Sequence, residues 1–551
     1  MIIEDFTSRD NWSGFDVCVV GSGPVGATLA HELRRHGLRV LILESGAMTE
    51  QAMTQELAAA EDFSTAAYDD LRKVNRRQLG GGANLWGGRC VPFDPIDFED
   101  RFTDARWPFS YDELAKHFPR AAHYAECGPA VFEHLSPLAF SDEDAFSMRH
   151  IERYSLVPSR LGRLYDTLAT DPDIVVQLNA TVTDFNAAES GEITSLTLRA
   201  QDGRCFAIRP KLVVLAMGGL ENARLLLNVQ RTRPNMFGGS TGALGKYYMG
   251  HFYGRIAEIE FRNEAAENAF RFYRDEHGFY VRRRFTPRPA TMKLQGGLNA
   301  AFWPVVPGIF DPAHGSATLS AAYLALRMKG LGPKLLPDII RERHAQTGQR
   351  LSAHIFNVMT RPHEIITQAL PMAYHRYLAA RKRPGLFITN PRHIYGLAYH
   401  GEQTPSAQSK VVLGRTQDHL GLNRLIPDLR FTVEDGNNLA ATHLALGAWL
   451  KHSGLGELRI GADQATLPDR ILAQTRQGNH QIGLTRMGTN GAQSVVDPDL
   501  RLHGLRNGFV VGASVFPTSG QANPTFTAMT LAVRLAAHLK LLAARKITIG
   551  M

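Results

Sequence analysis

Three glycines near the N-terminus have the spacing of a loop that holds a phosphate group. Gly21, Gly23 and Gly26 follow an apolar run that ends at Val20, and a helical pattern follows them. Gly21 permits a tight turn, Gly23 lets a pyrophosphate approach the backbone at a helix N-terminus, and Gly26 permits close packing of helix on strand. This spacing predicts a dinucleotide site.

Glu44 supports the nucleotide interpretation. It ends a second apolar run roughly twenty residues after the glycines, where a carboxylate accepts hydrogen bonds from ribose hydroxyls. Because an acid rather than an arginine stands there, the motif predicts FAD or NAD and disfavours NADP. The alternative is a glycine turn in an ordinary βαβ unit.

The elements that must position these residues form a βαβ unit over residues 15–44. A second buried run, residues 212–217, precedes Gly218 and a helical stretch at 220–228. Buried apolar runs that alternate with helices are typical of parallel sheets covered on both faces. We therefore expect the second run to lie in the same parallel sheet as the first.

A further glycine-rich stretch, residues 80–88, has five glycines in nine positions. Glycine disfavours regular helices and strands, so we expect a loop where the backbone passes close to a ligand. Trp86 in its middle favours packing on a ligand or on the core over a free surface loop.

The C-terminal block contains His480, a strand at 508–512, and a polar loop that leads through Asn523 into a helix at 526–542. The N-terminus of that helix can face an anionic part of a cofactor. Taken alone, His480 is one of 21 histidines, for which a structural role is the default. No HExxH or similar spacing is present, so we expect no metal.

Composition sets further limits. A chain of 551 residues can bury more than one core, so we expect two or more domains. The net charge of +8 comes without a lysine-rich tail, and we expect no binding of nucleic acid. Four cysteines without CxxC spacing, an N-terminus without a signal-peptide pattern and no long apolar run predict a cytoplasmic protein without membrane attachment.

The pattern changes over residues 251–479. Alternating segments at 280–285 and 296–302 predict strands of a more antiparallel sheet. Residues 319–344 combine apolar and basic residues in a helical pattern, which allows two interpretations, an interfacial membrane segment or a helix pair of a substrate-binding domain. Glycines and prolines interrupt the pattern and favour the helix pair.

In this order the motifs resemble those of the glucose–methanol–choline (GMC) flavoprotein oxidoreductases. The resemblance covers nearly the whole chain and implies an α/β fold, α+β overall, with a Rossmann-like FAD-binding domain and a mostly antiparallel-sheet substrate-binding domain. The motifs that carry it are residues 21–44, 80–88, 107–108, 213–224, 247–251, 402–413 and 480–524. The implied domains are 1–125 and 151–250 for FAD, 251–479 for substrate, and 480–551 as a return to the FAD domain.

The resemblance also implies a catalytic pair, His480 and Asn523, of the His/Asn subgroup. Oxidation of an alcohol to a carbonyl moves a hydride from carbon to flavin N5 and a proton from oxygen to a base. A neutral imidazole can take the proton, and an amide can orient the alcohol oxygen. The residues expected to bind FAD are Gly21, Gly23, Pro24, Val25, Gly26, Glu44, Ser45, Gly81, Gly82, Asn84, Leu85, Trp86, Gly87, Val182, Ala216, Gly218, Gly512, Ala513, Asn523, Pro524 and Thr525.

Two positions depart from the family pattern. Some relatives link a histidine of the glycine loop covalently to the flavin, and Leu85 stands at that position, so we expect non-covalent FAD. Many relatives have an aspartate where this chain has Gly512. Contact with the ribityl chain of the flavin must then come from backbone or water.

The substrate is less defined. The glycine loop resembles that of bacterial sugar and polyol dehydrogenases, so we expect a sugar, glycoside or polyol, and a dehydrogenase rather than an oxidase. The acceptor is oxygen, a quinone or an electron-transfer protein. The alternatives are a bulky apolar alcohol or secondary metabolite, a hydroxynitrile-type lyase, a non-catalytic FAD-binding protein and an NAD-dependent dehydrogenase.

Overall fold

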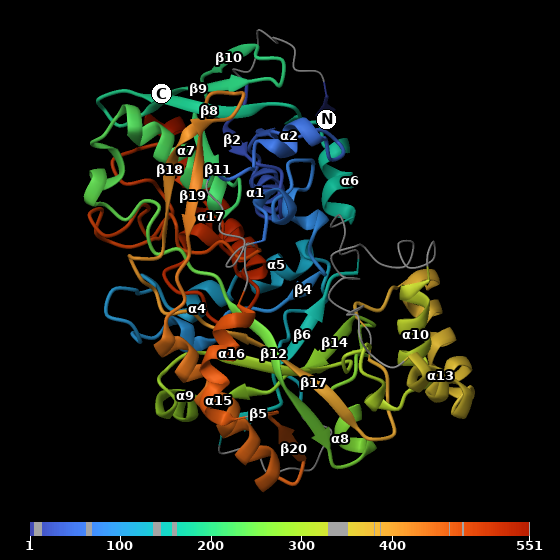
Figure 1. The fold of residues 1–551 in the computed structure, drawn as a ribbon. Coiled ribbons are helices and arrows are strands. Elements are labelled where there is room, and N and C mark those ends of the chain that lie inside the picture. Colours follow the sequence, from blue (N-terminus) through green and yellow to red (C-terminus); the bar gives the residue numbers. More distant parts are fainter. Residues whose placement is uncertain are drawn as a thin grey trace.

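The computed structural model describes residues 1–4, 14–61, 69–135, 145–156, 162–328, 351–379, 381–385, 387–461, 463–475 and 479–549. A parallel sheet with its helices occupies the upper part of the molecule in Figure 1, and an antiparallel sheet with its helices occupies the lower part. The fold class expected from the sequence is confirmed.

The parallel sheet is assembled from four separate regions of the chain. Every neighbouring pair of its six strands is parallel, and all residues of the four central strands are buried. Its strand order is β1 (Ile2–Ile3), β7 (Ile174–Gln177), β3 (Val40–Leu43), β2 (Val17–Val20), β11 (Leu212–Leu215) and β21 (Gly508–Val510). The expected strand at 212–217 therefore lies in the parallel sheet, as the sequence predicts, and it pairs with β2.

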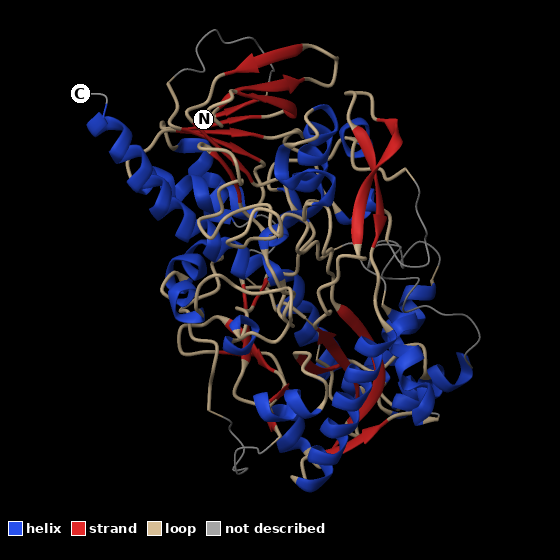
Figure 2. Cartoon of the chain, turned by 90° about the vertical axis from the view of Figure 1, so that its left-hand side faces the viewer, coloured by secondary structure: helices blue, strands red, loops and turns tan. Residues whose placement is uncertain are grey.

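Two helices from opposite ends of the chain pack together beside this sheet. Helix α1 (Pro24–Arg35) begins directly after the glycine turn, and α17 (Pro524–Ile549) packs against it and against α5 (Phe118–Tyr124). Figure 2 shows α17 as the long helix that leads to the C-terminus. Residues 524–544 have the length and composition of a membrane span, which the sequence analysis did not expect, but 61% of the most apolar window is buried inside the protein. This packing is that of a core helix.

The antiparallel sheet lies in the other half of the molecule. Its strand order is β16 (Ala300–Val305), β17 (Ile394–Gly401), β12 (Phe252–Phe261) and β20 (Gly456–Arg459). Helices α15 (Val433–His452) and α16 (Leu467–Gln474) pack beside it. β12 and β17 carry residues to the boundary between the two halves.

Smaller sheets complete the fold. A set of short antiparallel strands joins the two halves, because β4 (Arg89–Cys90), directly after the glycine-rich loop, pairs with β6 (Ile151–Tyr154), and β6 pairs with β14 (Tyr280–Arg283). The remaining described strands are β5 (Phe146–Ser147), β8 (Thr181–Ala187), β9 (Ile193–Arg199), β10 (Cys205–Ile208), β13 (Tyr273–Arg274), β15 (Thr286–Pro287), β18 (Lys410–Gln417) and β19 (Asn423–Asp428).

Further helices cover these sheets and their connections. Those of six or more residues are α6 (Gly162–Thr170), α7 (Gly219–Thr232), α9 (Pro289–Leu294), α10 (Ala317–Arg327) and α13 (Leu351–Thr360). The region 319–344, expected to be helical, is α10 up to Arg327, and its residues 329–344 lie outside the described residues.

Two short helices, α4 (Tyr111–Ala115) and α5, follow one another here, and Pro119 lies in the first turn of the second. One expected element differs from the structure. The strand expected at 296–302 begins only at Ala300, because Gly296 and Gly297 have φ values of +93° and +89° that a strand does not allow.

Candidate active site

A cavity of about 450 Å³ opens between the glycine turn, the glycine-rich loop and the C-terminal block. Gly26 and Asn84 do not line it; Asn84 instead donates hydrogen bonds to the carbonyls of Leu79 and Gly81 and holds the loop in shape. The other expected residues all line this cavity: Gly21, Gly23, Pro24, Val25, Glu44, Ser45, Gly81, Gly82, Leu85, Trp86, Gly87, Val182, Ala216, Gly218, His480, Gly512, Ala513, Asn523, Pro524 and Thr525.

The three glycines of the turn have different steric roles. A Cβ on Gly21, where φ is +106°, would lie 2.6 Å from the carbonyl oxygen of Ala216, and one on Gly26 would lie 2.0 Å from that of Gly21. A Cβ on Gly23 would meet no atom within 4 Å. Gly23 therefore leaves open space at the N-terminus of α1, where free N–H groups and the helix dipole favour a phosphate.

Glu44 is buried and engaged with the turn itself. Its Oε2 accepts hydrogen bonds from the backbone N–H (3.0 Å) and the hydroxyl (2.6 Å) of Ser22, and its Oε1 accepts one from the N–H of Gly46 (2.9 Å). Burial raises the pKa of this carboxyl. The Ser22 hydroxyl in turn accepts from the N–H of Gly80, so Glu44 also anchors the glycine-rich loop. The expected ribose contact stays a prediction, since a carboxylate oxygen can accept a second hydrogen bond.

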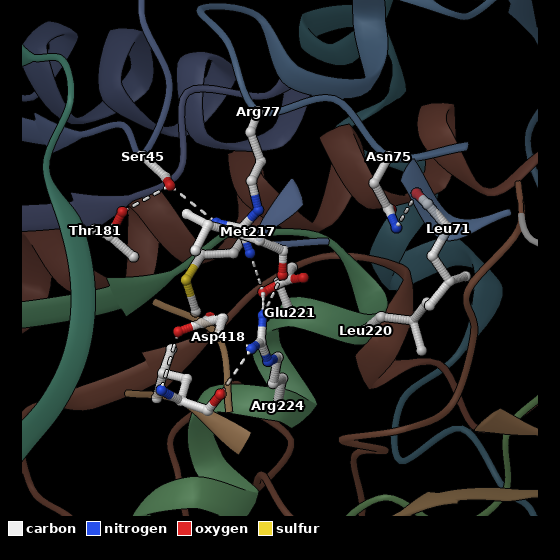
Figure 3. A network of polar contacts seen from close by, with 12 residues as sticks. Ser45, Leu71, Asn75, Arg77, Thr181, Met217, Leu220, Glu221, Arg224 and Asp418 are labelled. Carbon is white, nitrogen blue, oxygen red and sulfur yellow. Dashed lines mark hydrogen bonds and ion pairs between the residues drawn. The ribbon is translucent and has the colours of Figure 1, made fainter. Parts of the chain in front are cut away.

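A polar network that sequence reasoning missed lies at the same end of the cavity (Figure 3). Arg77 donates to the Ser45 hydroxyl at 2.9 Å and forms an ion pair with Glu221 at 2.5 Å. Ser45 also shares a hydrogen bond with Thr181 at 2.8 Å, and Glu221 lies 3.8 Å from Arg224. Arg77, Thr181 and Glu221 line the cavity. Arg77 and Thr181 lie outside the sequence motifs, and Glu221 lies within the motif at 213–224 but was given no role there.

At the other end of the cavity the structure brings His480 and Asn523 together. The Nε2 of His480 lies 3.2 Å from the Nδ2 of Asn523, although the two residues are 43 positions apart. Asn523 directly precedes α17, and His480 lies two residues before Ile482, which bridges to Met249. Both residues line the cavity.

A second histidine, His251, contacts the ring nitrogen of His480 that does not face Asn523. Sequence reasoning gave this histidine no role. The Nδ1 of His251 lies 2.7 Å from the Nδ1 of His480, and the Nε2 of His251 lies 3.1 Å from the carbonyl oxygen of Ser519. A carbonyl only accepts, so His251 donates from Nε2, and its Nδ1 holds the lone pair. His480 must then donate from Nδ1, which leaves the lone pair of a neutral His480 on Nε2, the nitrogen that receives the N–H of Asn523.

The histidines of this cluster are held neutral. Burial lowers the pKa of His251 to about 4. Burial also lowers the pKa of His480 well below 6.5, and the positive charge of Arg89 acts in the same direction. His400, whose ring is stacked on that of His251 with 5.4 Å between the centroids, has a lowered pKa for the same reason. At neutral pH, His480 is therefore a base rather than an imidazolium.

Arg89 brings a cation to this end of the cavity. Its guanidinium pairs with Glu152 at 2.6 Å and lies 4.1 Å from the ring centroid of Trp303. It lines the same cavity as His480. Arg89 follows the glycine-rich loop in sequence, which is the one signal that could have identified it.

The residues present fit a dinucleotide whose phosphates lie at the glycine turn. Added Cβ atoms on Gly23, Gly82 and Gly218 would meet no protein atom within 4 Å, so open space follows the backbone along the cavity. At the other end, the buried Oδ1 of Asn523 has no hydrogen-bond partner among the described residues, so a bound molecule can supply one. Gly512 has φ +141°, a conformation that an aspartate rarely adopts.

Comparisons with known proteins agree with this geometry. Residues 405–532 match the family described as GMC oxidoreductase, and residues 14–56 match the FAD binding domain. A 6'''-hydroxyparomomycin C oxidase of Streptomyces lividus is 23% identical, over 95% of this chain and 92% of that protein. A paromamine 6'-oxidase of Streptomyces fradiae is 26% identical, over 44% of this chain and 55% of that protein.

A solved fungal aryl-alcohol oxidase superposes on 97% of this chain and 100% of its own, with a TM-score of 0.53 and 14% identity, which shows a shared fold. Residues 405–532 are therefore similar to GMC oxidoreductases and residues 14–56 to an FAD binding domain, within a fold that the chain shares with the aryl-alcohol oxidase.

Proposed function

We propose that this protein oxidises the CH–OH group of a sugar, glycoside or polyol to a carbonyl, with His480 as the base. The observation that carries the proposal is the pair formed by His480 Nε2 and Asn523 Nδ2, 3.2 Å apart at the cavity wall. A general base must present a lone pair where the substrate proton arrives, and the hydrogen bonds of His251 place that lone pair on Nε2.

The protein residues share the work as follows. His480 takes the hydroxyl proton on Nε2, and its Nδ1–H stays bonded to His251 throughout. Asn523 Nδ2 donates to the alcohol oxygen as negative charge develops there, and an amide does this without a protonation state of its own. Bound FAD supplies the acceptor for the hydride. The glycine turn, Glu44 and the loop at 80–88 would hold the cofactor.

We further propose that FAD is bound without a covalent link. Leu85 lines the cavity at the position where some relatives carry the linking histidine, and its side chain has no nucleophilic atom. Denaturation of the purified protein is expected to release all of the flavin into the supernatant. Flavin that stays with the precipitated chain would contradict this.

The relative of Streptomyces lividus supports the substrate class, since its name describes an oxidase of an aminoglycoside, and the second relative is named for a related compound. The glycine-loop pattern supports a dehydrogenase, with a quinone or an electron-transfer protein as acceptor, whereas both relatives are named oxidases. Re-oxidation of the reduced protein by air within the time of one turnover would indicate an oxidase.

The experiment that tests the reaction is product analysis. Sugars, glycosides, polyols and apolar alcohols are incubated with the protein and an artificial electron acceptor, and masses are measured. The proposal predicts a product that lacks two hydrogens and an equal amount of reduced acceptor. Cleavage of a hydroxynitrile with no reduced acceptor would instead show a lyase.

A further inference from the structure

One helical unit of the molecule exposes apolar side chains in an unusual way. It consists of α13 and the turns that follow it, Ile365–Ala369, Leu370–Ala373 and Tyr374–Leu378. In Figure 1, α13 lies at the outer edge of the lower half, beside α10. We call six of its side chains, each between 52% and 77% exposed, the apolar face: Ile355, Phe356, Met359, Ile366, Leu370 and Leu378.

The polarity of α13 is inverted relative to a core-packed helix. Toward α10, the helix presents His354 and Asn357, both of which contact the Ser320 hydroxyl at 3.1 Å. The His354 ring is also stacked on Tyr323, with 4.2 Å between the centroids. A surface helix of a globular protein normally buries its apolar side. Here polar groups hold the unit on the protein, and Phe356 and Met359 point away from it.

The described part of the same region carries an excess of positive charge. The charged side chains described within residues 317–383 are five basic ones, Arg327, Arg361, Arg381, Lys382 and Arg383, and one acid, Glu364. Arg361 is 41% exposed and lies 3.5 Å from Glu364, and Lys382 is exposed four residues after Leu378 in the sequence. Apolar side chains beside a concentration of positive charge are complementary to an anionic membrane surface.

We propose that the apolar face binds the surface of a membrane that contains anionic lipids, with Phe356 and Met359 inserted among the acyl chains. The attachment is peripheral, because α13 has ten residues and a span needs about 20. The sequence suggested an interfacial segment or a helix pair only for residues 319–344, and the apolar face lies outside that range, at residues 355–378. The inference does not depend on the proposed reaction.

The test is co-sedimentation of the full-length flavoprotein with vesicles. One set contains phosphatidylcholine alone, and the other also contains phosphatidylglycerol. We expect binding to the phosphatidylglycerol vesicles that weakens as salt is added, since salt screens the charge attraction. Binding to neither set, or equal binding to both at any salt concentration, would overturn the proposal.

A double variant, Phe356→Ser with Met359→Ser, is expected to weaken vesicle binding by at least roughly tenfold because two apolar side chains are lost from the contact. Its FAD content and activity should be unchanged. Leu294→Ser is the matched control, since Leu294 is 82% exposed at the end of α9, away from the apolar face, and should not affect binding. Vesicle binding by the double variant equal to that of the wild type would overturn the proposal. The proposal would also be overturned if the wild type dimerised without vesicles and the double variant did not.

Discussion

The Nδ1 atoms of His251 and His480 lie 2.7 Å apart. Two ring nitrogens at this distance share one proton, and the Ser519 carbonyl on the far side of His251 determines that His480 carries it. One backbone carbonyl therefore sets the tautomer of His480 through the His251 ring, and Nε2 of His480 is left as the acceptor at the cavity. His251 is a positioning residue, because it acts through His480.

Removal of the Nδ1 acceptor of His251 should slow the chemical step. His251→Leu leaves His480 free to adopt the other tautomer, and we expect kcat to fall about 10- to 100-fold, the range found for residues that orient a functional histidine. KM should change little. His251→Asn is the matched variant, because its Oδ1 can accept the proton of His480 Nδ1 and its Nδ2 can donate to Ser519.

Steady-state kinetics and pH profiles of His251→Leu and His251→Asn test this prediction. The account predicts that Asn restores kcat toward the wild-type value and that Leu does not. Equal losses in the two variants, with equal losses of thermal stability, would show that His251 serves packing alone.

Loss of the base itself should have a larger effect. His480→Ala is expected to reduce kcat by about 10²- to 10⁴-fold, the usual contribution of a general base. The visible spectrum should show bound flavin as in the wild type, because the glycine turn and Glu44, which would hold the cofactor, are unchanged. Wild-type turnover by this variant would revive a non-catalytic role for the pair.

The pH dependence follows from the lowered pKa of His480. A base acts in its neutral form, so kcat/KM should be at its plateau above pH 6.5 and fall as the pH drops through the lowered pKa. The acid limb should therefore have its midpoint below 6.5, the ordinary value for histidine. Initial rates measured across this range, with folding checked by circular dichroism, test the prediction, and a midpoint at or above 6.5 contradicts it.

Two alanine substitutions separate cofactor binding from folding. Gly23→Ala adds a Cβ that meets no protein atom, so the chain should fold normally but hold FAD more weakly, because the new methyl group occupies the space for the phosphates. Gly26→Ala places its Cβ 2.0 Å from the Gly21 carbonyl oxygen and should lower the stability of the apoprotein by about 1–3 kcal/mol. Flavin content and urea unfolding distinguish the two, and normal FAD affinity in Gly23→Ala would contradict the account.

The local parts of this fold could be predicted from the sequence. Gly21 and Gly26 were assigned their steric roles from spacing alone, because a turn between strand and helix is decided by neighbouring residues. The buried run that forms β11 predicts a strand of the same parallel sheet, and the structure adds that this strand pairs with β2. The His480–Asn523 pair came from a resemblance, since no spacing rule connects them.

The contacts that sequence reasoning missed join distant parts of the chain. His251 and His480 are 229 positions apart, and Arg77 meets Glu221 only because the loop and α7 face the same cavity. Glu44 was expected to face the ribose, but its nearest donors are Ser22 and Gly46, which depends on how the turn closes. Such pairings are set by tertiary packing and leave no local pattern.

The most direct test of the central claim is a visible spectrum of the purified protein under anaerobic conditions, before and after addition of sugars, glycosides and polyols. The account predicts flavin absorption that bleaches with a substrate of this class in the wild type and far more slowly in His480→Ala. A protein that binds no flavin even after reconstitution with FAD would contradict the assignment of the cavity. Flavin that stays oxidised while a substrate is converted would contradict the proposed oxidation.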